Sequence, residues 1–175
     1  MPRPQEADFP EYFARYIAKV SGNHIKDAIQ NHSADLTDFY NRLPEQKAGY
    51  RYAPGKWTMR EVLQHVTDTE RIFSYRVLRI ARKDKTPLPS FDENSYAENS
   101  RANEKSLSSI KEEFLAVRKA TDLLLSGLND EQLSEQGISS NMPVTVNAIC
   151  FIIYGHLMHH KLVLEEKYLL NSSVQ

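Results

Sequence analysis

Apolar residues recur along most of this chain with the period of an α-helix. Spacings of three, four and seven residues give one apolar face to each of several long segments. In the first of them Ile25, Ile29 and Leu36 mark this face, and Pro44 follows as a stop signal. The pattern predicts a short helical piece within Tyr12–Val20 and four long helices over His24–Leu43, Thr58–Arg82, Ser106–Leu128 and Val144–Leu170.

Two local features support these helices. Thr58 and Glu61 stand at the start of the second long helix with the spacing of a capping box, in which each side chain binds a free backbone N–H group. The beginning of the fourth helix, VTVNAICFIIY, is apolar on nearly every side, which predicts the most buried element of the fold. Four long helices with few strand signals predict an all-α fold, a four-helix bundle.

The connection between the second and third helices is long and polar. It covers residues 83–105, where Pro87 and Pro89 oppose a regular helix. A loop of this length is either a lid or binding loop, with Phe91–Tyr96 able to close over a pocket, or a plain crossover that spans the bundle. Residues 128–143 form a second polar connection.

Composition narrows the class of protein. The 175 residues, 41% hydrophobic and 26% charged, predict one globular domain over residues 1–175. With 22 Lys and Arg against 23 Asp and Glu, the net charge of -1 argues against nucleic-acid or anionic membrane partners. The single cysteine, Cys150, excludes an internal disulfide and reads as an inert core residue. The longest apolar run, Ala148–Tyr154, is far below the ~20 residues of a membrane span, and the first residues lack a secretory pattern, so we expect a cytoplasmic protein.

The histidines are the candidate metal-binding residues of this sequence. His156 and His160 stand four residues apart in the fourth helix, so their side chains lie about 40° apart on one face. Such a pair either packs in the core with hydrogen bonds or binds one divalent metal ion. His159 points to the edge of this face, and His24 and His32 lie in polar surroundings typical of the surface.

A third ligand can come from the second helix. His65 lies at the border of its apolar stripe and meets His156 and His160 if the two helices pack side by side. Three imidazoles leave a coordination position open, as catalytic metal sites do, and favour Zn, Ni, Fe or Cu over Mg or Ca. Asp68, three residues after His65, could orient an imidazole or accept a proton, or be a solvated surface acid.

Three stretches of the chain, PGKW, LQHVTDTE and GHLMHH, carry a resemblance to a known family. Residues 50–99 and 155–169 resemble the DinB superfamily, most closely its YfiT-like branch of metal-dependent hydrolases. The resemblance implies a four-helix bundle, a homodimer, and a three-histidine metal site made by His65, His156 and His160. It also implies chemistry with a low-molecular-weight thiol such as bacillithiol or mycothiol, which some members join to an electrophile or use in an isomerisation. Where some members have Arg and Gln after the last ligand, this chain has Lys161-Leu162-Val163.

Three hypotheses on function follow. The first is an enzyme with one divalent ion per chain, foremost Zn or Ni, that activates a small thiol for S-transfer or a water for hydrolysis of a small substrate. The second is a non-catalytic metal-binding or stress-response protein. The third is a helical scaffold without a metal. Thiol transfer needs less proton chemistry, and Asp68 is the sole acid–base candidate near the histidines in the sequence, so we favour the thiol reaction.

Overall fold

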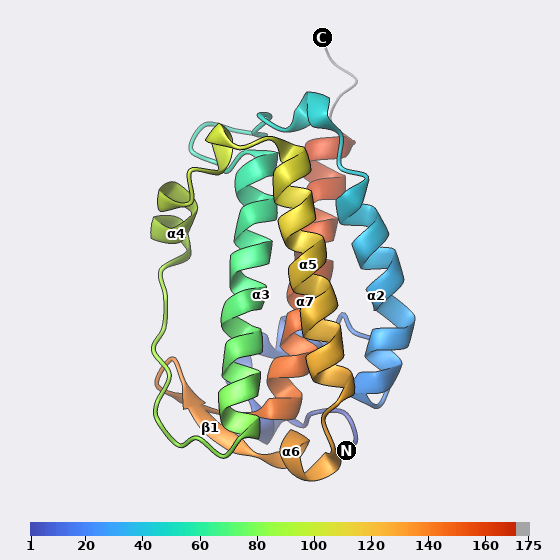
Figure 1. Ribbon diagram of the computed structural model, residues 1–175, viewed down its shortest axis with the longest axis vertical. Coiled ribbons are helices and arrows are strands. Elements are labelled where there is room, and N and C mark those ends of the chain that lie inside the picture. Colours follow the sequence, from blue (N-terminus) through green and yellow to red (C-terminus); the bar gives the residue numbers. More distant parts are fainter. Residues whose placement is uncertain (171–175) are drawn as a thin grey trace.

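The computed structural model describes residues 1–170, and four long helices form its body (Figure 1). Helix α3 packs against α5 and α7, and α2 packs against the same two helices, so α2 and α3 occupy opposite corners of a bundle. The predicted all-α four-helix bundle is confirmed, whereas the predicted domain 1–175 extends beyond the described residues. The four helices are α2 (Ile25–Asn41), α3 (Met59–Ala81), α5 (Leu107–Ser126) and α7 (Val146–Val163).

Capping side chains set where the long helices begin. Thr58 Oγ1 accepts a bond from the Glu61 backbone N–H at 3.2 Å, and the Glu61 carboxylate accepts one from the Thr58 N–H at 2.7 Å. The predicted capping box of α3 is therefore present. Ser106 and Thr145 cap α5 and α7 through their hydroxyl oxygens in the same way.

Helix α7 is the most buried element, as its composition predicts. Every residue from Val146 to Leu157 is buried. The fourth helix begins two residues later than expected, because Val144 and Thr145 belong to a strand, and it continues after Val163 as a π-helical segment, η5 (Leu164–Leu169). Within residues 1–170 no helix combines the length and the apolar character that crossing a membrane requires.

The crossover between α3 and α5 returns the chain along the length of the bundle, so these two helices run in the same direction (Figure 1). It contains a short helix, α4 (Glu93–Asn99), and a 3-10 turn, η4 (Ala102–Glu104). The expectation of no regular helix in this stretch is wrong. Pro87 and Pro89 both precede Asp92, whose side chain caps α4, so neither proline interrupts this helix.

The second connection is more structured than its polar sequence suggests. It forms helix α6 (Asp130–Ser134) and an antiparallel hairpin of β1 (Gln136–Ser139) and β2 (Met142–Thr145). Ser140 and Asn141 turn the hairpin with φ of 52° and 64°, the left-handed conformation that tight hairpin turns need. Leu88 of the crossover bonds to Ile138 O and accepts from Ser140 N, each at 2.9 Å, which ties the crossover to the hairpin.

The N-terminal segment crosses one side of α7. It forms the 3-10 turns η1 (Glu6–Asp8) and η2 (Glu11–Phe13) and the short helix α1 (Ala14–Ile17), and another such turn, η3 (Glu45–Lys47), follows α2. A Cβ atom at Gly155 of α7 would lie 2.2 Å from Tyr16 O, so α1 reaches this position only because residue 155 is glycine. The close approach places Tyr16 beside the histidines of α7.

Candidate metal centre

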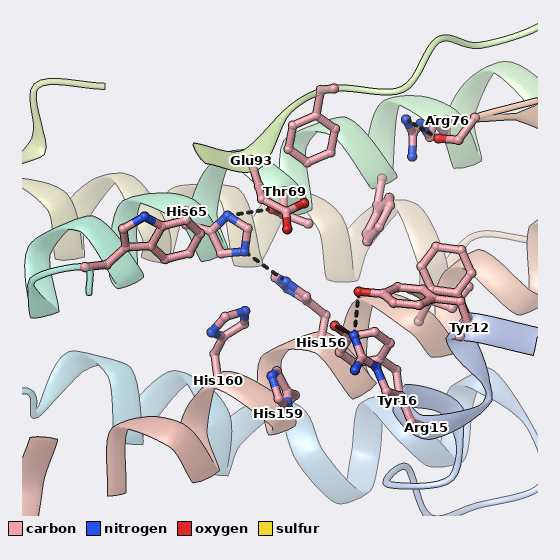
Figure 2. A pocket seen from close by; sticks show the side chains of 16 residues that line it. Tyr12, Arg15, Tyr16, His65, Thr69, Arg76, Glu93, His156, His159 and His160 are labelled. Carbon is pink, nitrogen blue, oxygen red and sulfur yellow. Dashed lines mark hydrogen bonds between the residues drawn. The ribbon is translucent and has the colours of Figure 1, made fainter. Parts of the chain in front are cut away.

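Three histidines from two helices meet inside the bundle (Figure 2). His65 comes from α3, and His156 and His160 come from successive turns of α7. Their ring centroids lie 5.1 Å (65–156), 4.9 Å (65–160) and 4.5 Å (156–160) apart. One nitrogen of each ring lies within 4.8 Å of one nitrogen of each other ring. The structure thus brings together the three residues that the sequence selected.

The arrangement fits a transition-metal ion. His65 Nε2 and His156 Nε2 are 3.2 Å apart, close to the ~3.4 Å between two nitrogens that bind one tetrahedral zinc ion at ~2.1 Å. His160 Nδ1 is buried and has no hydrogen-bond partner among the described residues, an unusual state for a polar atom. A set of three imidazole nitrogens suits Zn or Ni better than Mg or Ca, which prefer oxygen.

Burial keeps the three imidazoles neutral. It lowers the pKa of His65 to about 4, with a smaller contribution from the charge of His159. Burial also lowers the pKa of His156 and of His160 well below the usual histidine range, and repulsion between the rings adds to this effect. Neutral imidazoles at pH 7 offer the lone pairs that a metal ion requires.

The polar neighbour of His65 is Thr69. Its Oγ1 lies 3.5 Å from His65 Nδ1, on the side of the ring away from His156 (Figure 2). A proton on Nδ1 leaves the lone pair of Nε2 directed at the other two histidines. Thr69 follows His65 by four residues, the spacing that keeps two side chains on one helix face.

Asp68 lies elsewhere. It accepts a bond from Gln64 Nε2 at 3.0 Å and is 3.6 Å from Arg71, and it borders a shallow depression next to Ser95 and Tyr96. Burial raises its pKa. The structure does not bring Asp68 to the histidines. Asp68 bonds to Gln64, which also bonds to Glu113 of α5, whereas Thr69 lies beside His65 Nδ1.

The histidines form one end of a cavity of about 340 Å³. Its other walls come from the N-terminal segment, α3, the crossover and the hairpin. Glu93 of α4 supplies a carboxylate that sequence reasoning missed, as it missed Arg15 and Arg76. The lining residues are Tyr12, Phe13, Arg15, Tyr16, Trp57, His65, Thr69, Phe73, Arg76, Phe91, Glu93, Ser140, Ile152, His156, His159 and His160.

Two sequence signals could have pointed to parts of this wall. A glycine inside a buried helix marks a close backbone approach, and Gly155 receives the turn that carries Tyr16. The segment Phe91–Tyr96, for which a binding loop was one of two alternatives, contributes Phe91 to the lining of the cavity. Trp57 lines the cavity as well, and its ring lies 4.7 Å from that of His65.

The remaining histidines stay outside the cluster of three. His159 is half-buried at its edge, with its ring 5.4 Å from that of Tyr16. His24 is exposed, as expected, and bonds to Met1 O. His32 is half-buried, and its Nε2 lies 2.9 Å from Ser21 Oγ.

Comparison with known proteins identifies the family. The DinB superfamily model matches residues 28–164, most of the chain. The chain belongs to the DinB superfamily. A protein of Oceanobacillus iheyensis named "putative metal-dependent hydrolase" is 25% identical over 134 residues, which cover 75% of this chain and 76% of that protein.

Solved structures of the DinB fold agree with the architecture. YfiT from Bacillus subtilis, described as a "probable metal-dependent hydrolase with an unusual four-helix bundle topology", superimposes with a TM-score of 0.69 and 17% identity over 94% of this chain and 90% of YfiT. A mycothiol-dependent maleylpyruvate isomerase gives a TM-score of 0.66 and 11% identity over 83% of this chain and 61% of its own. At these identities the likeness confirms the YfiT-like fold.

Proposed function

We propose that this DinB protein is an enzyme that holds one divalent transition-metal ion, Zn or Ni, on His65, His156 and His160. The observation that carries the proposal is the convergence of three imidazoles, two of them buried and that of His160 half-buried, at the end of a cavity of about 340 Å³. A purely structural ion has four protein ligands, whereas three ligands next to a cavity leave a position for a substrate. The names of the relatives, a metal-dependent hydrolase and a thiol-dependent isomerase, point in the same direction.

The favoured reaction is transfer of a low-molecular-weight thiol to an electrophile. An ion held by neutral ligands keeps its full charge and lowers the pKa of a thiol, which makes the thiolate available at neutral pH. The chain's own residues supply the binding surface, because the aromatic side chains of Tyr16, Trp57 and Phe73 line the cavity.

A second depression supports a reaction with two substrates. Trp57, His159 and His160 also line a hollow of about 300 Å³ whose other walls include Tyr52 and Lys56. One member of the cluster, His160, therefore borders both spaces, and we assign one space to the thiol and the other to its acceptor. Hydrolysis of a small substrate is the second candidate, and Glu93 favours it, because this carboxylate lines the cavity and could take a proton from water.

Metal analysis tests the site. We expect the protein, purified without a histidine tag, to contain one ion per chain by elemental analysis. His156→Ala should abolish stoichiometric metal and His65→Ala should weaken binding strongly, because each removes a ligand. His159→Ala is the matched control on the same helix and should keep its metal. One ion per chain in both ligand variants would place the metal site elsewhere.

Turnover separates the enzyme from a non-catalytic metal-binding protein. The fully loaded protein is assayed with a panel of thiols, including bacillithiol and mycothiol, plus a chloronitrobenzene electrophile, and separately with nitrophenyl esters. We expect thiol transfer that a chelator removes and that His65→Ala lacks. Ester hydrolysis lost in Glu93→Gln would favour the hydrolase instead. If the loaded protein never exceeds the uncatalysed rates, the enzyme proposal fails and the binding protein remains.

A further inference from the structure

Arg76 of α3 is a buried cation without an anionic partner. The residue is 4% exposed. Its Nη2 donates to two neutral acceptors, Pro89 O at 2.7 Å and Ser140 Oγ at 3.4 Å, and its guanidinium lies 5.4 Å from the Phe73 ring centre. Among the described residues it forms no ion pair with a carboxylate, and burial alone lowers its pKa.

Arg118 shows what a compensated arginine looks like in the same bundle. It is equally buried, but it pairs with Glu70 at 2.7 Å and with Asp122. A buried charge without such partners costs free energy, and proteins rarely retain one without a use for it. Arg76 differs from Arg118 in a second respect, because it lines the cavity that ends at the cluster of three histidines.

Arg76 lies on the same face of α3 as His65, further along the helix. His65, Thr69 and Arg76 follow one another at spacings of four and seven along one face of α3, so the Cα atoms of His65 and Arg76 are ~16 Å apart along the helix. Figure 2 shows Arg76 at one end of the cavity and the three histidines at the other.

The charge of the cavity wall favours an anion. A second guanidinium, that of Arg15, lies on the wall and bonds to the hydroxyl groups of Tyr12 and Tyr16. Glu93 is the one carboxylate among the lining residues. Two arginines therefore face a single negative charge, and the divalent cation of the proposed function would add to the positive side when bound.

Arg76 is held ready for a ligand. The bonds between Leu88 and the hairpin fix Pro89 and Ser140, and these hold Nη2, one of the three guanidinium nitrogens. A guanidinium fixed in this way loses little freedom when it binds a planar carboxylate through two N–H groups.

We propose that Arg76 binds the carboxylate of an elongated small-molecule substrate whose reacting end reaches the three histidines. The substrate class is an acid with its reactive group, such as a thiol, at the end of the molecule opposite the carboxylate. This inference rests on the proposed function, because it assigns the far end of the same substrate cavity. Arg15 adds positive potential to the wall of the cavity.

The test compares acids with matched alcohols. The protein is loaded with Co(II), and the thiolate-to-cobalt absorption band is titrated with ω-mercaptoalkanoic acids of increasing chain length and with the corresponding ω-mercaptoalkanols. We expect an optimum chain length at which the acid binds about ten-fold or more tightly than the alcohol, since a charge-assisted bidentate contact is strong. Equal affinities of acid and alcohol at every length would overturn the proposal.

Variants connect the preference to Arg76. Arg76→Gln should reduce it to less than about two-fold, and Arg76→Lys should keep part of it, because a lysine retains the charge without the two-pronged geometry. Arg79→Gln is the matched control: Arg79 lies one turn further along α3, pairs with Asp84 and does not line the cavity. If a folded Arg76→Gln protein keeps the full preference for acid over alcohol, the proposal is contradicted. If that variant does not fold, an undiminished preference in Arg76→Lys contradicts the proposal.

A metal-free measurement separates this inference from the proposed function. Calorimetric titration of the metal-free protein compares hexanoate with 1-hexanol, and we expect only hexanoate to bind, in a manner that salt weakens. If cobalt or thiol binding fails but hexanoate still binds through Arg76, the metal-enzyme proposal is wrong and the anion site stands. If metal and thiol bind but neither the mercapto acids nor hexanoate bind better than the matched alcohols, only the anion site is wrong and the metal-enzyme proposal stands.

Discussion

Acidification should destabilise the metal-free protein through its buried histidines. A histidine in the unfolded chain has a pKa of ~6.5, whereas burial lowers the pKa of His65 to about 4 in the folded state. As the pH falls below 6.5 the unfolded state takes up protons first, so folding stability is lost between pH 6.5 and pH 4. His156 and His160, whose pKa values are also lowered by burial, act in the same direction.

The size of the effect follows from the pKa difference of His65. Between pH 8 and pH 5 this side chain alone removes about 2 kcal/mol from the free energy of unfolding. A domain has about 5–15 kcal/mol in all, so the loss is a substantial fraction. Glu70 and Asp68, whose pKa values are raised by burial, contribute with the opposite sign. A comparison with a variant is needed to isolate the histidine.

Urea unfolding in the presence of a chelator, at steps from pH 8 to pH 5, measures this difference. We expect wild type to lose about 2 kcal/mol more than His65→Gln over this range, because glutamine does not titrate. His24→Gln, at an exposed position, is the control and should follow wild type. If the curves of wild type and His65→Gln run parallel, burial does not lower the pKa of His65 and this account is wrong.

Two further substitutions test the packing around the site. Glu70→Gln should lower the free energy of unfolding in urea by about 3 kcal/mol, because it removes the main charge partner of Arg118 where both side chains are 2% exposed. A loss below ~1 kcal/mol would show that Asp122 alone compensates the charge of Arg118. Gly155→Ala should lower the melting temperature strongly, since its Cβ would lie 2.2 Å from Tyr16 O. Gly127→Ala, where the nearest atoms are 3.5 Å away, should leave it nearly unchanged, and equal effects of the two alanines would contradict this account.

The long helices could be predicted because their signals are local. An apolar face repeats within a few residues, and the cap of α3 needs only Thr58 and Glu61, so neighbours in the sequence suffice to define these elements. The hairpin and α4 escaped prediction for the opposite reason. The hairpin strands hold four residues each, too short for a clear period, and they gain support from Leu88, fifty residues away in the chain.

The candidate site also has a part that local sequence predicts and a part that depends on packing. Helix geometry places His156 and His160 on one face and His65 at the border of another apolar stripe, and the resemblance to the DinB superfamily implies the same three ligands. Spacing could not decide which side chain contacts the His65 ring, because Asp68 and Thr69, three and four residues later, lie on opposite sides of His65 on the helix. Only the packing of α3 between α5 and α7 turns Thr69 toward the histidines and Asp68 away from them.

The sequence by itself determined the helices, the bundle and the metal-ligand candidates, whereas the tertiary structure alone decided what faces those ligands. Arg15, Arg76 and Glu93 reach one cavity from the N-terminal segment, α3 and the crossover. Their meeting depends on contacts such as Gly155 against Tyr16, which form only after distant segments have packed. Local periodicity reflects interactions within one turn of a helix, but the wall of a cavity reflects the sum of all contacts between elements, and no short stretch of sequence contains that sum.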